Sequence, residues 1–159
     1  MRVGLISDTH DLMRPEAIDA LRGCDHLIHA GDICSPEVLE ALSALAPLTV
    51  VRGNNDAGLW AKAVPASAVV ALEGARILVI HDVGDLRGAV PKDVDVVVSG
   101  HSHKPLILER GGVRFVNPGS AGPRRFTLPI AVAELVIEEG NVSPRIIELT
   151  VAPKVVSRN

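Results

Sequence analysis

The amino-acid sequence predicts an α/β fold built on two β-sheets. In residues 1–52, short apolar strands alternate with helices, which is typical of right-handed parallel β-α-β units. After residue 68, strand-like runs come in pairs around glycine-containing turns, which indicates antiparallel hairpins. The first half is therefore expected to be parallel and the second half more antiparallel. At 159 residues the chain fits one domain, expected to span residues 1–159.

The first half contains three predicted strands, at residues 2–7, 25–29 and 48–52. A helix is expected over residues 15–22, because Pro15 is favoured in a first turn, where its missing N–H is not needed. A second helix is expected to begin at Pro36, with Ser35 as its N-cap, and to run to about Leu45.

The second half contains three predicted hairpins. Residues 69–73 and 76–80 flank Gly74-Ala75, and residues 106–109 and 113–116 flank Gly111-Gly112. Residues 130–137 and 142–149 flank a turn at residues 139–141. Residues 95–99, dominated by valine, read as a strand that is buried on both faces.

The composition excludes several classes of protein. The chain is 47% apolar but has no tyrosine, two phenylalanines and one tryptophan, so valine, leucine, isoleucine and alanine must build its core. No apolar run approaches the ~20 residues of a membrane span, and no signal-peptide pattern is seen, so a cytoplasmic protein without a membrane partner is expected. A net charge of -3 gives no basic surface for nucleic acid. Cys24 and Cys34 match no zinc-binding spacing and read as free thiols.

Polar side chains follow five of the predicted strands, at the point where each strand ends. Two pairs, in "SDTH" and "GHSH", stand two residues apart, so both members of each pair face the same side of an extended segment. The carboxyl ends of strands are where open α/β sheets bind ligands. Seven side chains able to bind a metal therefore collect at one edge: Asp8, His10, Asp32, Asn54, His81, His101 and His103.

Each motif alone is weak, and Asn54 alone reads as a turn residue. Together the five segments predict a metal site. Seven nitrogen and oxygen ligands exceed what one tetrahedral ion needs, so two divalent ions sharing at least one carboxylate are expected. Mn²⁺ is favoured, with Fe, Zn²⁺ and Ni²⁺ as alternatives. No nucleophilic serine or cysteine is needed, and direct attack of metal-bound hydroxide on a phosphoester is the expected mechanism.

The order of these motifs closely resembles that of the calcineurin-like metallophosphoesterase superfamily. The stretches "HAGD", "VRGN", "GHSHKP" and "NPGS" are similar to those of its small, single-domain bacterial and archaeal phosphodiesterases. The resemblance runs from Met1 to about Leu149. It implies a four-layer α/β-β/α sandwich, in which two mixed sheets are flanked by helices and the metals lie between strand ends.

The resemblance also implies a division of the ligands. One ion would be held by Asp8, His10 and His103, and the other by Asn54, His81 and His101, with Asp32 shared between them. Asn117, in "NPGS", would lie near the substrate, although a simple Pro-Gly turn explains the stretch equally well. Arg124 would meet the substrate phosphate, with a solvated surface arginine as the alternative.

This sequence departs from the family pattern at two positions. Many relatives carry a histidine at the position of Asn55, thought to protonate the leaving group, with the neighbouring carboxylate of Asp56 as its orienter. An amide donates a hydrogen bond but no proton. Asp82 stands where relatives commonly have glycine, and its carboxylate either tunes the metal site or faces water. His29, at the end of the second strand, is a candidate for a role behind the ligands.

The expected function is that of a dinuclear metal-dependent phosphoesterase acting on a small phosphoester, preferably a diester or another ester with a good leaving group. The alternative is a non-catalytic protein-binding scaffold of the same fold, like the retromer's vacuolar-sorting subunit. Retention of all seven ligand positions favours the enzyme. A zinc hydrolase of a non-phosphate substrate is disfavoured by the order of the ligands. The substrate, and whether the chain forms a homo-oligomer, stay open.

Overall fold

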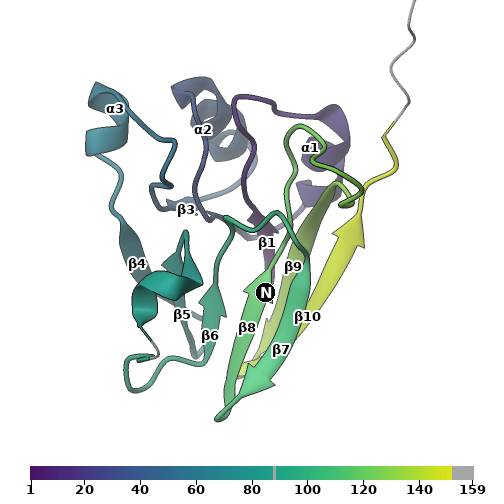
Figure 1. Cartoon of the computed structure of the whole chain (residues 1–159). Coiled ribbons are helices and arrows are strands. Elements are labelled where there is room, and N and C mark those ends of the chain that lie inside the picture. The colour runs from purple at the N-terminus through teal and green to yellow at the C-terminus, as the bar shows by residue number, and fades with distance from the viewer. Residues whose placement is uncertain (88, 152–159) are drawn as a thin grey trace, which may run out of the picture.

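The computed structural model describes residues 1–87 and 89–151. Its strands form two five-stranded mixed sheets (Figure 1). The first sheet has the order β10-β9-β1-β2-β3, with β1 (Arg2–Ile6), β2 (His26–His29), β3 (Leu48–Val50), β9 (Ala131–Glu138) and β10 (Asn141–Glu148). The second has the order β4-β5-β6-β8-β7, with β4 (Ser67–Leu72), β5 (Ala75–Ile80), β6 (Val96–Val98), β7 (Leu106–Arg110) and β8 (Val113–Asn117).

Each sheet has a parallel centre and antiparallel edges. β1, β2 and β3 pair in parallel, as predicted, and so do β5, β6 and β8 in the second sheet. The β9-β10 hairpin returns to the first sheet and pairs antiparallel with β1. The predicted α/β sandwich of two mixed sheets is therefore confirmed. Six parallel strands end on loops that carry the predicted site.

An aliphatic core lies between the two sheets. It includes Val3, Leu5, Ile77, Val79 and Leu135, all fully buried. The valines of β6 are also fully buried, as expected for a strand covered on both faces. Aromatic side chains contribute little, since Phe126 is 88% exposed. The composition therefore predicted the chemistry of the core correctly.

Helices cover the outer face of the first sheet. α1 (Pro15–Leu21), α2 (Pro36–Ser43) and α3 (Leu59–Lys62) share a second apolar cluster with that face. Proline begins α1 and α2, as predicted, and Ser35 occupies the N-cap position of α2. The Ser35 side chain makes no capping hydrogen bond, however. No helix in the described part of the chain is long and apolar enough to cross a membrane.

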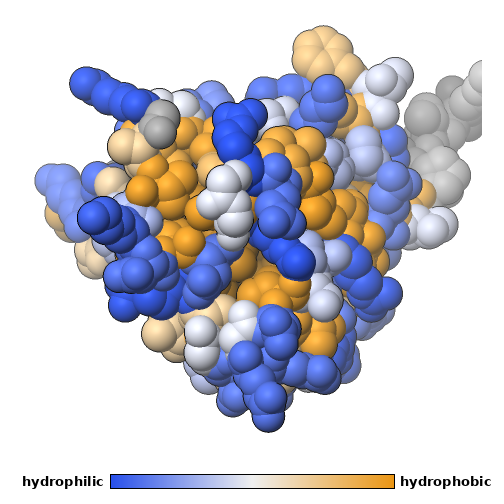
Figure 2. All heavy atoms as spheres, turned by 90° about the horizontal axis from the view of Figure 1, so that it is seen from below, coloured by the Kyte–Doolittle hydropathy of each residue, from blue (hydrophilic) through white to orange (hydrophobic). Residues whose placement is uncertain are grey.

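The outer face of the second sheet has a much thinner cover. In the described residues it carries a single turn of 3-10 helix, η1 (Val83–Leu86). A hollow of about 670 Å³ is left there, lined by apolar side chains that include Leu86, Val94, Val113 and Phe115. Seen from below, apolar side chains reach the surface between charged ones (Figure 2). The sandwich is therefore asymmetric, with its described α-helices on the outer face of the first sheet.

Candidate metal centre

The loops after β1 and β2 are tied together along their backbones. The N–H groups of Asp8, His10 and Asp11 donate to the carbonyls of Gly31, Asp32 and Ile33, at 3.0, 3.0 and 2.8 Å. The "SDTH" and "HAGD" motifs therefore form one unit, although they begin 22 residues apart in the chain. This pairing places the side chains of both loops on the same side of the sheet edge.

Five of the seven predicted ligands have a left-handed backbone: Asp8 (φ 54°), His10 (45°), Asp32 (57°), His101 (70°) and His103 (62°). For residues with a Cβ atom this conformation costs roughly 1–2 kcal/mol each. Such strain persists where the surrounding structure imposes it, and it collects at functional sites. The loops are therefore shaped for the position of these side chains rather than for local stability.

The first group of ligands surrounds one oxygen of Asp8. This carboxylate is fully buried, and its Oδ1 lies 3.4 Å from His103 Nε2, 3.8 Å from His10 Nε2 and 3.9 Å from His81 Nε2. Oδ1 nevertheless makes no hydrogen bond. A buried carboxylate oxygen without a donor is costly, and a cation among these nitrogens would satisfy it.

The spacing of the histidines fits a metal ion. The Nε2 atoms of His10 and His103 face each other at 3.4 Å. Two nitrogens that each lie about 2.0–2.1 Å from one ion at a tetrahedral angle are about 3.4 Å apart. Asp8, His10 and His103 thus form one group whose ligand atoms all lie within 4.8 Å of one another.

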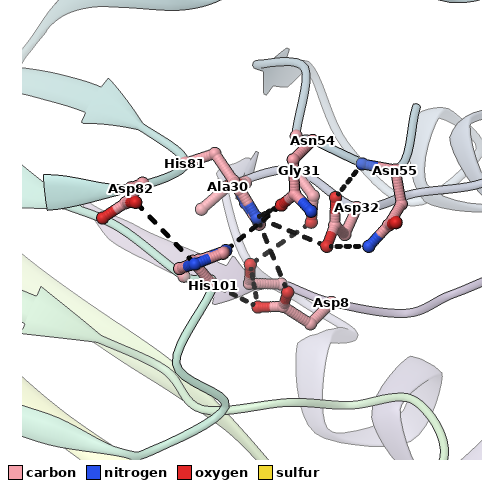
Figure 3. A network of polar contacts seen from close by, with 12 residues as sticks. Asp8, Ala30, Gly31, Asp32, Asn54, Asn55, His81, Asp82 and His101 are labelled. Carbon is pink, nitrogen blue, oxygen red and sulfur yellow. Dashed lines mark hydrogen bonds and ion pairs between the residues drawn. The ribbon is translucent and has the colours of Figure 1, made fainter. Parts of the chain in front are cut away.

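The second group gathers around Asn54. Its Oδ1 lies 3.0 Å from His81 Nε2 and 3.1 Å from His101 Nδ1 (Figure 3). Asp32 lies between the two groups, since its Oδ2 is 3.3 Å from His81 Nε2 and 3.6 Å from His10 Nε2. All seven predicted side chains therefore meet at one place, with Asp32 in the middle.

The pKa values of the two carboxylates, Asp8 and Asp32, are shifted in opposite directions. Burial raises the pKa of Asp8 above its usual range. Burial also acts to raise the pKa of Asp32, but hydrogen bonds from His81 and Asn55 outweigh it and hold this pKa well below its usual range. Burial lowers the pKa of His103 to about 4, with help from the charges of Arg125 and His10. His103 is therefore neutral at pH 7 and free to bind a metal.

Hydrogen bonds behind the ligands fix the tautomer of His81. Its Nδ1 lies 2.7 Å from the carbonyl oxygen of Ala30, so Nδ1 must carry a proton and donate it. Nε2 faces the site: it donates to Asp32 when the ring is protonated, and it is bare, as a metal ligand must be, when the ring is neutral. Burial opposes the charged form of His81, but its bonds to Asp32 and Ala30 raise its pKa. This arrangement is typical of metal-binding histidines.

His29 lies behind the ligands and joins their loops. It is fully buried, its Nδ1 accepts from the Gly31 N–H at 3.0 Å, and its Nε2 lies 3.0 Å from Thr9 Oγ1. Burial, together with the charge of His81, lowers its pKa to about 3. A neutral ring with its proton on Nε2 satisfies both contacts. His29 therefore supports the residues next to Asp8, His10 and Asp32.

Asp56 and Asn55, predicted to be catalytic, both contact the loop that carries Asp32. The buried carboxylate of Asp56 accepts four backbone N–H groups, from Asp32, Ile33, Cys34 and Gly53, at 2.8–3.0 Å. Asn55 donates its N–H to Asp32 Oδ1 and its side-chain amide to Asp32 Oδ2, both at 2.9 Å. This geometry favours positioning roles for both residues.

The two predicted substrate-binding residues, Asn117 and Arg124, both donate hydrogen bonds to groups of the protein. Asn117 donates to the Gly100 carbonyl at 2.9 Å and to Ser102 Oγ at 3.1 Å, so it holds the "GHSH" loop. Arg124 is exposed and donates to the Leu128 carbonyl at 3.4 Å.

Two other arginines lie nearer to the ligands. The charge of Arg125 acts on His103. Arg52 lines a cavity of about 450 Å³ together with Asn54, His81 and His101. The sequence offered one signal for Arg52, which stands inside the "VRGN" motif. It offered none that separates Arg125 from Arg124.

Two sheets that carry aspartate, histidine and asparagine side chains at their strand ends define a metallophosphoesterase fold and site. The family model of the calcineurin-like phosphoesterase superfamily domain matches residues 1–140. A probable metallophosphoesterase of Methanothermobacter thermautotrophicus is 37% identical over 142 residues, which cover 81% of this chain and 82% of the relative. A second probable metallophosphoesterase, from Methanocaldococcus jannaschii, is 34% identical over 153 residues, covering 87% and 77%. The chain belongs to the calcineurin-like phosphoesterase superfamily.

Solved structures of similar fold include an enzyme and sorting proteins. A novel archaeal phosphodiesterase is 25% identical, with a TM-score of 0.76 over 92% of this chain and 100% of its own. Vacuolar protein sorting 29 from Cryptosporidium parvum is 22% identical, with a TM-score of 0.79 over 94% and 91%. Its counterpart from Entamoeba histolytica, complexed with Zn²⁺, is 24% identical, with a TM-score of 0.71 over 93% and 99%. The sorting proteins establish likeness of fold alone.

Proposed function

We propose that this metal-dependent phosphoesterase is a dinuclear phosphodiesterase. The observation that carries the proposal is the meeting of seven candidate ligand side chains from five loops, three of which place a histidine Nε2 within 3.9 Å of the unsatisfied Oδ1 of Asp8. Asp8, His10 and His103 would hold one divalent ion, and Asn54, His81 and His101 the other. Asp32 would be shared, because its Oδ2 lies within 3.6 Å of a histidine from each group.

The bound ions, with Mn²⁺ as the favoured metal, would neutralise phosphate charge and lower the pKa of water in the site. The chain's own residues do the rest. The Asp56 carboxylate and the His29 ring hold the loops that present the ligands. Arg52, beside the second group, and Arg125, near His103, supply positive charge that attracts a phosphoester anion.

Two observations support a diester with a good leaving group. The archaeal phosphodiesterase is similar in fold over its whole length. Asn55 stands where many relatives keep a proton donor, and its amide is engaged with Asp32. A site without a general acid depends on leaving groups that depart as stable anions. Diesters with acidic alcohols, such as nitrophenyl esters, meet that need.

The test is hydrolysis of bis-nitrophenyl phosphate and nitrophenyl phosphate by protein loaded with Mn²⁺. We expect the diester to be cleaved faster than the monoester. Asp32→Asn should lose turnover with both esters and should also retain less metal, while keeping the fold. Wild-type rates in Asp32→Asn at saturating Mn²⁺ would overturn the shared role of Asp32. Metal-loaded protein that cleaves no phosphoester would favour the scaffold alternative.

A further inference from the structure

His101 is the most exposed histidine of the candidate metal centre. Its side chain is 47% exposed, against 21% for His10, 6% for His81 and 4% for His103. It also has a left-handed backbone, which its surroundings must impose. An exposed and strained ligand has little packing to hold its ring. Something else is needed to keep its Nδ1 directed at Asn54.

The far ring nitrogens of two other ligands already have neighbours. His81 Nδ1 faces the Ala30 carbonyl at 2.7 Å, and His10 Nδ1 lies 3.6 Å from Cys34 Sγ. For His101 the neighbour is a carboxylate, because its Nε2 lies 3.7 Å from Asp82 Oδ2. Figure 3 shows Asp82 on the side of the ring opposite to Asn54.

Asp82 is itself held in place. It is the N-cap of η1, and its Oδ1 accepts the N–H of Gly84 at 2.9 Å. One oxygen therefore fixes the side chain, and the other faces the imidazole. Asp82 and His101 also line the same cavity beside Asn54 and His81. Where relatives commonly have glycine, this chain thus presents an anchored negative charge to a metal ligand.

We propose that Asp82 is a positioning residue for the second metal ion, acting through His101. The inference rests on the ligand roles proposed above. In the metal-free protein, Asn54 Oδ1 accepts from His101 Nδ1 at 3.1 Å, and the Asp82 carboxylate lies 3.7 Å from Nε2, beyond hydrogen-bond distance. When an ion takes the place of the proton on Nδ1, the proton of the neutral ring is on Nε2 and faces the carboxylate, whose negative charge favours the ion-bound state.

The charge balance of the two groups gives this carboxylate a further effect. The first group contains the Asp8 carboxylate together with the shared Asp32. The second group has only Asp32, because Asn54, His81 and His101 are neutral as ligands. A negative charge behind His101 lowers the free energy of a divalent ion at the second position. Asp82 therefore compensates for the weaker of the two groups.

The test measures Mn²⁺ affinity by calorimetric titration of metal-free protein, without any assay of activity. Asp82→Asn removes the charge and keeps a side-chain oxygen able to cap η1. We expect it to weaken the second, lower-affinity binding step by about 2–5-fold, as a half-exposed charge contact does, and to leave the first unchanged. Asp85→Asn is the matched control, because it removes the same charge from the same cavity lining without a contact to His101.

A second readout is the salt dependence of binding. Because Asp82 acts on His101 through charge, the difference in Mn²⁺ affinity between the wild type and Asp82→Asn should shrink as the ionic strength rises. Equal loss of affinity in Asp82→Asn and Asp85→Asn, or no loss in either, would overturn the proposal. Wild-type protein that binds fewer than two ions would instead contradict the proposed function, so the two failures are distinguishable.

Discussion

At position 55 this chain has an asparagine amide where many relatives have a histidine ring, and the two side chains differ in the proton transfers they allow. Its two hydrogen bonds hold both oxygens of Asp32. An amide serves that purpose well, but it has no proton to give to a leaving group. That this site lacks a proton donor stays a prediction from the residue type. The sequence did not predict the contact with Asp32, which depends on how the loops after β2 and β3 meet.

We therefore expect Asn55→His to restore general-acid help, which is typically worth ~10²–10⁴-fold. The rate with an alkyl phosphodiester should rise more than the rate with a nitrophenyl diester, because only the alkyl alcohol needs a proton to leave. Steady-state kinetics with both esters, at matched metal content, measure the difference. Asn55→Ala serves as the control for loss of the amide. Parallel changes with both esters would show that position 55 takes no part in proton transfer.

We expect His29 to make the metal-free protein sensitive to acid. Its pKa is about 3 in the folded protein and about 6.5 in an unfolded chain, so the folded state binds fewer protons. Its contribution to stability is complete above about pH 6.5 and is lost as the pH falls toward 3. The expected slope is up to ~1.4 kcal/mol per pH unit.

His29→Gln removes this titration. The variant should be less stable at neutral pH, because the Gly31 N–H loses its acceptor. Its free energy of unfolding should decline less steeply with acid, by about one proton, than that of the wild type. Urea unfolding of metal-free protein at several pH values measures both quantities. Identical slopes in the two proteins would show that His29 is not the group that titrates.

At the scale of an element, the loop after β3 is joined to the loop after β2 by Asp56. The four N–H groups that its carboxylate accepts come from both loops. Asp56→Asn would leave two of these buried donors facing an amide N–H, at a cost of about 1–3 kcal/mol each. We expect a loss of about 3 kcal/mol in the free energy of unfolding, whereas Asp85→Asn on η1 should change it little. An unchanged stability with a lower turnover would support the catalytic role instead.

The left-handed loops allow a second test at this scale. Glycine adopts φ 70° without strain, so in metal-free protein His101→Gly should be more stable than His101→Ala by about 1 kcal/mol. At Ser102, whose φ is not positive, the order should reverse, with the alanine variant more stable. Thermal unfolding of the four variants gives the comparison. Equal stability of the two His101 variants would show that this loop is not strained.

The predicted elements were largely correct where local chemistry decides them. The prolines at the starts of α1 and α2 and the glycine turns of the hairpins marked real boundaries. α3 and η1 were not predicted, because each is a single turn with no apolar periodicity. The roles of Asp56 and Asn117 were also hidden, since both residues act on backbone groups of loops distant in sequence.

At the scale of the whole molecule, the order of strands was beyond prediction from patterns along the chain. The β9-β10 hairpin joins the first sheet beside β1, more than 120 residues earlier in the sequence. The seven ligands could still be predicted as a set, because the rule for parallel strand ends does not depend on strand order. What the structure adds is the distances between these side chains, with Asp32 Oδ2 3.6 Å from His10 Nε2 and 3.3 Å from His81 Nε2.

The central claim is that two metal ions share Asp32. A crystal structure of the protein grown with Mn²⁺, with anomalous scattering recorded, tests it most directly. We expect two anomalous peaks about 3.5–4 Å apart, with the carboxylate of Asp32 bound to both. One peak should lie beside Asp8, His10 and His103, and the other beside Asn54, His81 and His101. A single peak, or two peaks of which only one contacts Asp32, would show that Asp32 is not shared by two ions.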